Sequence, residues 1–149
     1  MITQSILRRS GDSERQGKCE DMTTWTLSTP GYSDVEVRIY PTRRAMKKAI
    51  GEYEANLPRS PMGYHCVLEN DDHDYLPVIL LNQVDCLNSA ITDVVAHETF
   101  HAVMSLFRIN RGLMVDVQPV TIDGEEEDDF ALLQGGLIKA IRNALKTSP

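Results

Sequence analysis

The stretch on which the fold of this chain depends reads VVAHETFHAVM, from Val94 to Met104. It is apolar on both sides of a short polar group and contains no glycine or proline, which is typical of a buried helix. Asn88 or Ser89 would cap its start, and Asn110-Arg111-Gly112 would end it. We therefore predict a helix from about 88 to 108 with one polar stripe, formed by His97, Glu98, His101, Ser105 and Arg108.

The polar group has the spacing H-E-x-x-H, which is the spacing of a metal site on a helix. Residues four apart lie on one helix face, so His97 and His101 can offer two imidazoles to one ion. Glu98 lies at the adjacent edge, where it can reach a water bound to that ion. The alternative is a helix with two core histidines and a glutamate. That alternative buries three ionisable groups without partners, which is costly, so the pattern favours a zinc site.

A catalytic zinc takes three protein ligands, and the third must come from elsewhere in the chain. A second helix is predicted at 123–145, with acidic residues in its first turn, where they also suit the helix dipole. At about 100° per residue, its apolar side chains lie within roughly 60° of Phe130. Glu127 falls near +60° and Glu126 near −40°, on that same side, by the same estimate of about 100° per residue. We predict Glu127 as the third ligand, with Glu126 and then Asp128 as alternates.

The remaining pattern predicts a single α+β domain, with a small, mostly antiparallel sheet packed on the H-E-x-x-H helix and the C-terminal helix. Strands are predicted at 35–40, 64–69 and 76–81, a short strand or lid at 25–27, and a helix at 43–57. An acidic turn at 70–74 would join two of the strands in a hairpin. His65 is predicted to be a strand residue with a hydrogen-bonded ring. Residues 1–21 are predicted to be a flexible tail, and 22–149 the folded domain.

Bulk properties narrow the classes of partner. The formal net charge is −7 and the pI about 5.0, which argues against a nucleic-acid partner. No apolar run approaches the ~20 residues that span a bilayer, and the N-terminus lacks the apolar core of a secretory signal. The three cysteines show no C-x-x-C spacing, so we expect reduced thiols and a cytoplasmic protein without a membrane partner.

The motifs also resemble a known family. H-E-T-F-H at 97–101, followed by an acidic helix start, resembles the gluzincins, the zincin metallopeptidases whose third zinc ligand is a downstream glutamate. E-D-D-F-A-L-L-Q-G-G-L at 127–137 resembles small phage and prophage proteins that carry H-E-x-x-H and then E-E-x-x-A-x-L-x-G. The resemblance covers roughly residues 76–140. Asp128 departs from it by standing where those proteins have a second glutamate, which keeps Asp128 open as the ligand.

The resemblance implies a zinc-dependent peptidase that acts on a protein or peptide, with Glu98 as general base. It also implies an edge strand before the motif helix that holds the substrate backbone, here 76–81 with Leu76, Val78 and Leu80. A second oxyanion donor would come from Tyr75, His73 or Tyr64. Two alternatives remain: a catalytically silent, phage-encoded zincin-fold module that binds zinc and inhibits a partner, and a metal-free structural protein.

Overall fold

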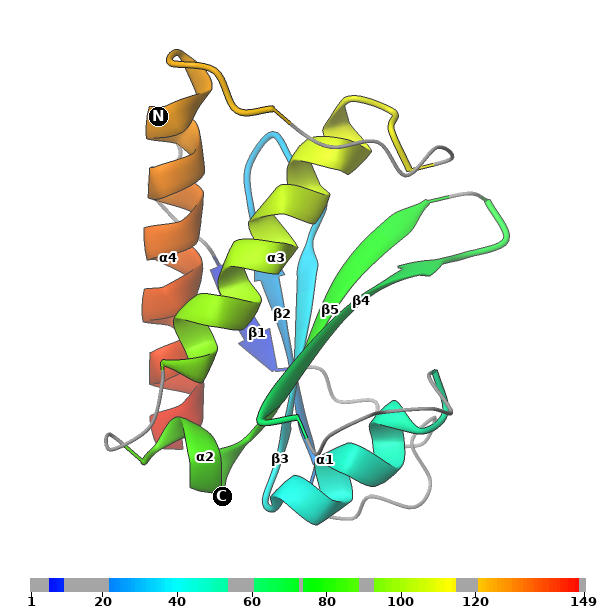
Figure 1. Cartoon of the computed structure of the whole chain (residues 1–149), viewed down its shortest axis with the longest axis vertical. Helices are drawn as coiled ribbons and strands as arrows, with labels where there is room; N and C mark the ends of the chain where they lie inside the picture. Colours follow the sequence, from blue (N-terminus) through cyan, green and yellow to red (C-terminus); the bar gives the residue numbers. More distant parts are fainter. Residues whose placement is uncertain are drawn as a thin grey trace.

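The computed structural model describes residues 6–9, 22–53, 61–72, 74–88, 93–114 and 121–147, and over these residues the chain has an α+β fold (Figure 1). In chain order the elements are β1 (Ile6–Arg9), β2 (Thr23–Ser28), β3 (Val35–Tyr40), α1 (Arg43–Ile50), β4 (Gly63–Glu69), β5 (Tyr75–Asn82), α2 (Gln83–Cys86), α3 (Val94–Asn110) and α4 (Glu126–Thr147).

The strands form one mixed sheet in the order β1-β2-β3-β5-β4. β1 with β2, β2 with β3, and β4 with β5 are antiparallel, whereas β3 and β5 are parallel, with Glu36 opposite Val78. The predicted hairpin is β4 and β5, which pair from Gly63 opposite Leu81 to Glu69 opposite Tyr75. The predicted α+β class with a mostly antiparallel sheet is thus confirmed.

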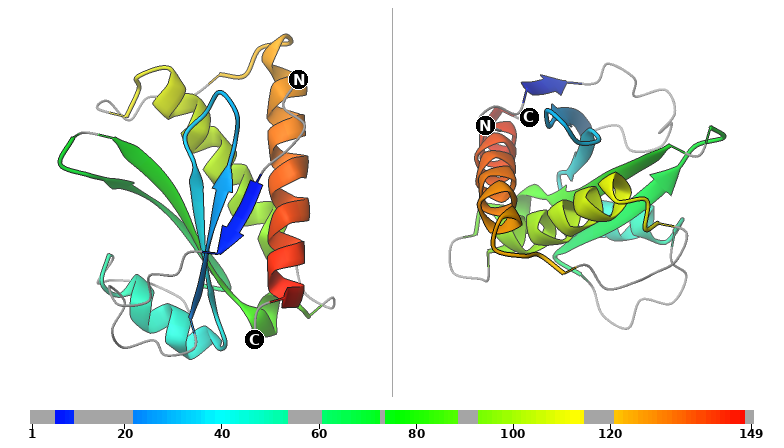
Figure 2. Two further views of the ribbon diagram at one scale, coloured as in Figure 1. Left: turned by 180° about the vertical axis from the view of Figure 1, so that it is seen from behind. Right: turned by 90° about the horizontal axis from the view of Figure 1, so that it is seen from above.

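Helices cover both faces of this sheet (Figure 2). Successive side chains of β5 therefore face different helices. Ile79 and Leu81 belong to the core beneath α3 and α4, and Val78 and Leu80 belong to the core beneath α1. All four of these side chains are fully buried. A strand that is covered on both faces needs a continuous apolar run, and that is the run that β5 provides.

The assignment of 76–81 as the edge strand is wrong. β5 lies between β3 and β4, so Leu76, Val78 and Leu80 are on an interior strand, and β4 ends the sheet order. Pro77 had favoured an edge position because proline cannot donate to a strand ladder. The pairing with β3 begins only at Val78, so Pro77 sits just before the part of β5 that is paired on that side.

The start of α3 also differs from the prediction. Its N-cap is Asp93 rather than Asn88 or Ser89. The short α2 precedes it, and there the side chain of Asn82 is the cap and accepts a hydrogen bond from Asp85 N. α3 then begins at Val94, where the Asp93 side chain accepts from Ala96 N at 3.1 Å. It ends as predicted at Asn110-Arg111-Gly112, with Gly112 at φ 69°, a conformation that glycine adopts without strain.

Two further differences concern the first half of the chain. Ile6–Arg9 forms β1, which pairs with β2, within the stretch 1–21 for which a flexible tail had been predicted. The rest of that stretch lies outside the described residues. α1 ends at Ile50 and is followed by Gly51, a poor helix former, rather than running to 57.

None of the helices that the structure describes is long and apolar enough to cross a membrane.

The packing of α4 on the sheet and α3 gives a first prediction. Leu137 is fully buried, whereas Leu132, on the same helix, is 44% exposed. Leu137→Ala should lower the free energy of unfolding by about 2–5 kcal/mol because it leaves a cavity. Leu132→Ala should change it by less than about 0.5 kcal/mol. Urea denaturation of both variants measures the difference, and equal losses would contradict this packing of α4.

Candidate metal centre

Two histidines of α3 point their ring nitrogens at one another. His97 Nε2 and His101 Nε2 are 3.3 Å apart, and the ring centroids are 4.9 Å apart with planes at 77°. Both residues are exposed, on the turn of α3 that faces solvent. The helix positions four residues apart therefore bring the two imidazoles together as the motif predicted.

The separation of these nitrogens fits a shared zinc ion. With bonds of about 2.0–2.1 Å and tetrahedral angles, two nitrogens on one zinc lie about 3.3–3.4 Å apart. Burial lowers the pKa of His101, and the neighbouring His97 and Arg108 act in the same direction. A lower pKa favours the neutral imidazole, which is the form that binds a metal.

Glu98 lies beside the pair but on the buried side of the helix. Its side chain is 8% exposed, and its Oε1 is 3.8 Å from His97 Nε2. Burial raises the pKa of Glu98, and the nearby His97 partly opposes this shift. A carboxyl with a raised pKa is a stronger proton acceptor once ionised, as a general base requires.

Glu98 and His97 form part of the wall of a pocket of about 300 Å³. The other lining residues are Pro61, Met62, Gly63 and Val94. The start of β4 can lie this close to α3 because residue 63 has no side chain. A Cβ at that position would be 2.8 Å from Glu98 Cγ and 2.8 Å from Val94 Cγ1, closer than atoms tolerate.

His65 joins the site from β4 and was not predicted to do so. Its Nε2 is 3.2 Å from Ser105 Oγ, and its ring is stacked on that of His101 with centroids 6.1 Å apart. The hydrogen-bonded ring on a strand was predicted, but its position beside the histidine pair depends on how β4 packs on α3. Burial lowers the pKa of His65 to about 4, so the ring is neutral at neutral pH.

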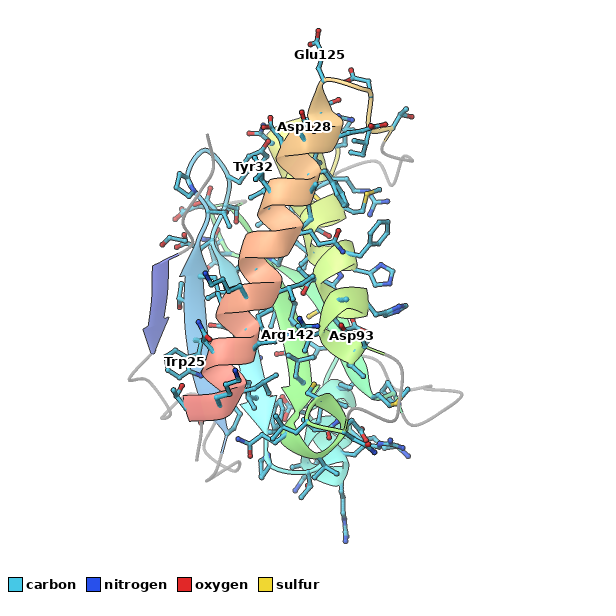
Figure 3. The ribbon with its side chains drawn as sticks, turned by 90° about the vertical axis from the view of Figure 1, so that its left-hand side faces the viewer. Trp25, Tyr32, Asp93, Glu125, Asp128 and Arg142 are labelled. Atoms are coloured by element: carbon cyan, nitrogen blue, oxygen red, sulfur yellow. The ribbon has the colours of Figure 1, made fainter. Side chains whose placement is uncertain are left out.

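The structure does not bring the predicted third ligand to the histidine pair. Glu126 forms an ion pair with Arg111, ten residues after His101, or about 15 Å further along the helix axis. Glu127 and Asp128 lie in the same first turn of α4 and are exposed. Figure 3 shows Asp128 at one end of α4, while Arg142 pairs with Asp93 near the other end.

Of the three candidates for a second oxyanion donor, the two that the structure describes lie away from the histidine pair. Tyr64 is on the α1 side of the sheet, Tyr75 begins β5 next to the hairpin turn, and His73 lies outside the described residues. Within the part of the chain that the structure describes, no group of three or more His, Cys, Asp or Glu side chains is placed to hold a metal ion. The described residues thus bring together two imidazole nitrogens and one buried carboxylate.

Cys66 and Cys86 are free thiols, and Cys19 lies outside the described residues. Burial raises the pKa of Cys66 to about 11 and that of Cys86 to about 12. Both thiols are therefore protonated at neutral pH, whereas zinc binds the thiolate.

Comparison of the chain with protein-family models, with curated proteins and with solved structures gave no match. The function is therefore inferred from the geometry of the site.

The contact between Gly63 and Glu98 gives a second prediction. Gly63→Ala should lower the free energy of unfolding by about 1–3 kcal/mol, because the new methyl group forces β4 or Glu98 to move. Gly135→Ala is the matched control: nothing lies within 4 Å of a Cβ at that helical position, so it should raise stability by about 0.5–1 kcal/mol. Urea denaturation of both variants tests this, and a neutral or stabilising Gly63→Ala would disprove the close approach.

Proposed function

We propose that this chain is a zinc-dependent peptidase of the zincin type, with His97 and His101 as metal ligands and Glu98 as general base. One observation carries the proposal: the two Nε2 atoms are 3.3 Å apart, a spacing that suits one zinc, next to a buried carboxylate at a pocket. Bound zinc would lower the pKa of its water towards ~7 and polarise the substrate carbonyl.

Glu98 would do the proton transfer. Its Oε1 would accept the proton of the attacking water and then deliver it to the leaving nitrogen of the peptide. Its position supports this role, because Oε1 lies 3.8 Å from a ligand nitrogen and the side chain faces the pocket. Because Glu98 is buried under the start of β4, its carboxylate has little freedom to turn away.

The substrate backbone would lie along β4. This strand ends the sheet order, so a peptide could add to it as a further strand. β4 starts at the pocket wall with Gly63 and continues past His101 with His65. Binding of the substrate backbone, which the family resemblance implied for residues 76–81, is thus proposed for β4 instead.

The pocket would hold one apolar side chain of the substrate. Its side-chain lining beyond His97 and Glu98 is Pro61, Met62 and Val94, which offer no charge. A cavity of about 150 Å³ is enough to bind benzene, so a pocket of about 300 Å³ has room for a single large side chain. An acidic side chain would be repelled by Glu98.

A second function, zinc binding without turnover, has an observation in its favour. The described residues provide two protein ligands, one fewer than catalytic zinc sites usually have. A protein of this kind would act by binding a partner rather than by cleaving it. Metal binding and hydrolysis must therefore be measured separately.

A third prediction separates the two functions. Glu98→Gln removes the base but leaves both imidazoles, so it should keep zinc and lose about 10²–10⁴-fold in kcat on a mixed peptide substrate. His97→Ala should lose zinc as well. Metal content after dialysis and hydrolysis rates are the two measurements.

Zinc bound by a wild type that cleaves no peptide would favour the binding module, as would full activity of Glu98→Gln. A wild type that holds no zinc after exposure to it would refute both functions.

A fourth prediction concerns the pocket. Met62→Ala widens it, so the variant should accept larger apolar side chains beside the scissile bond and bind smaller ones less well. Leu87→Ala, at an exposed position outside the pocket, should leave the preference unchanged. Cleavage-site profiling of a peptide library tests this. An unchanged profile for Met62→Ala would mean that the pocket does not hold a substrate side chain.

A further inference from the structure

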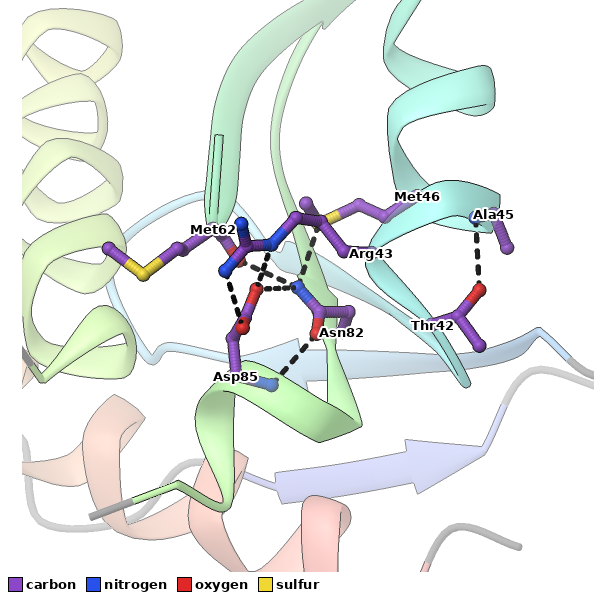
Figure 4. Close-up of polar contacts among 7 residues, drawn as sticks. All are labelled: Thr42, Arg43, Ala45, Met46, Met62, Asn82 and Asp85. Carbon is purple, nitrogen blue, oxygen red and sulfur yellow. Dashed lines mark hydrogen bonds and ion pairs between the residues drawn. The ribbon is translucent and has the colours of Figure 1, made fainter. Parts of the chain in front are cut away.

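A buried polar network lies behind the pocket wall (Figure 4). At its centre is Asn82, the last residue of β5, which is fully buried. Its side-chain amide donates hydrogen bonds to Met62 O at 3.0 Å and to Asp85 Oδ2 at 2.8 Å. Its Oδ1 accepts from Asp85 N at 2.8 Å. One side chain thus joins the end of β5, the start of α2 and the residue before β4.

A second side chain holds Asn82 in this orientation. Asp85 is 7% exposed and receives two hydrogen bonds from Arg43, Nε to Oδ2 and Nη2 to Oδ1, both 2.7 Å long. These bonds hold the pKa of Asp85 below its usual value, so the carboxylate remains charged. Because Asp85 Oδ2 also accepts from Asn82, the amide has one favourable orientation, with its N–H groups towards Met62.

The network ends at the candidate site. Met62 and Gly63 line the pocket, and Gly63 is the residue in close contact with Glu98. Met62 directly precedes β4, and its carbonyl accepts the hydrogen bond from the Asn82 amide. A shift of this carbonyl would move the wall that faces Glu98.

The helix cap alone does not account for Asn82. Capping α2 needs only an acceptor at Oδ1, which aspartate or serine would supply equally well. The hydrogen bond to Met62 O needs a donor, and among the usual capping residues only the amide of asparagine offers both groups in this geometry. Burying such a network gains little stability over an apolar core. Its gain is the fixed position of the main chain at Met62.

We propose that Asn82 is a positioning residue of the candidate active site, which holds the Pro61–Gly63 wall against Glu98 through the carbonyl of Met62. The inference rests on the proposed peptidase function. Arg43 and Asp85 orient Asn82, and Asn82 in turn sets the position of the substrate at the start of β4.

Asn82→Asp and Asn82→Ser, made in the full chain, test this as the fifth prediction. Both keep an acceptor for the α2 cap. Aspartate has no donor for Met62 O, and the serine hydroxyl is one bond shorter than the amide, so its single oxygen cannot reach both Asp85 N and Met62 O as the two atoms of the amide do. We expect kcat/KM for an apolar peptide to fall by on the order of tenfold to a hundredfold, chiefly through KM, with zinc content unchanged. Amide hydrogen exchange at Met62 to Tyr64 should become faster.

Thr42→Ala is the control for lost stability alone. Thr42 Oγ1 caps α1 by accepting from Ala45 N at 3.1 Å, next to the network but not in it (Figure 4). At a temperature where all variants are folded, Thr42→Ala should keep the wild-type KM and the wild-type exchange at Met62 to Tyr64.

The possible failures are distinguishable. A wild type without zinc or hydrolysis refutes the proposed function. A wild type that cleaves peptides, together with an unchanged KM and unchanged exchange in Asn82→Asp and Asn82→Ser, refutes the positioning role alone. An equal rise of KM in Thr42→Ala would also refute it, because the effect would then come from lost stability.

Discussion

The close approach of β4 to α3 is the constraint on which the rest of the site depends. It is possible only because Gly63 has no side chain: a Cβ there would lie 2.8 Å from both Glu98 Cγ and Val94 Cγ1. The contact removes Glu98 from water and raises its pKa, and it closes the pocket on one side. It also sets the outer strand of the sheet beside the two histidines. The absence of a side chain at Gly63 thus links the sheet, the Glu98 carboxylate and the pocket.

The helical period of α3 places buried apolar side chains and exposed histidines within a few residues of one another. Val94, Val95 and Ala102 are buried against the sheet and α4, whereas His97 and His101 face solvent. Glu98 lies between these two groups, buried but next to the two imidazoles. A buried carboxylate without a positive partner is costly, and a bound cation would offset part of that cost. The proposed zinc would thus offset part of the cost of burying Glu98.

Local sequence patterns predicted the elements well, and pairing between distant segments was where they failed. H-E-x-x-H placed two imidazoles together because a helix fixes that distance by itself. Which strand ends the sheet depends on the partners of β5, and its apolar run and Pro77 did not reveal them. Both Glu126 and Glu127 had been predicted on the buried side of α4; Glu126 is half-buried, but Glu127, the preferred ligand, is exposed, and neither lies beside the histidine pair. The position of these residues along the helix axis, relative to the histidines, depends on how α4 packs against α3. There Phe130 contacts Phe107, and Glu126 forms an ion pair with Arg111.

The role of Asn82 could not have been predicted from sequence, for a related reason. At the end of an apolar strand, an asparagine indicates a helix cap, and it is one. Its second role exists because the chain turns into β4 at Met62, whose part-buried carbonyl accepts a hydrogen bond from the Asn82 amide. The nearest strand end is that of β5, and its amide satisfies the carbonyl at 3.0 Å. The hydrogen bond that satisfies Met62 O thereby also fixes the Pro61–Gly63 wall of the pocket, which a substrate would contact.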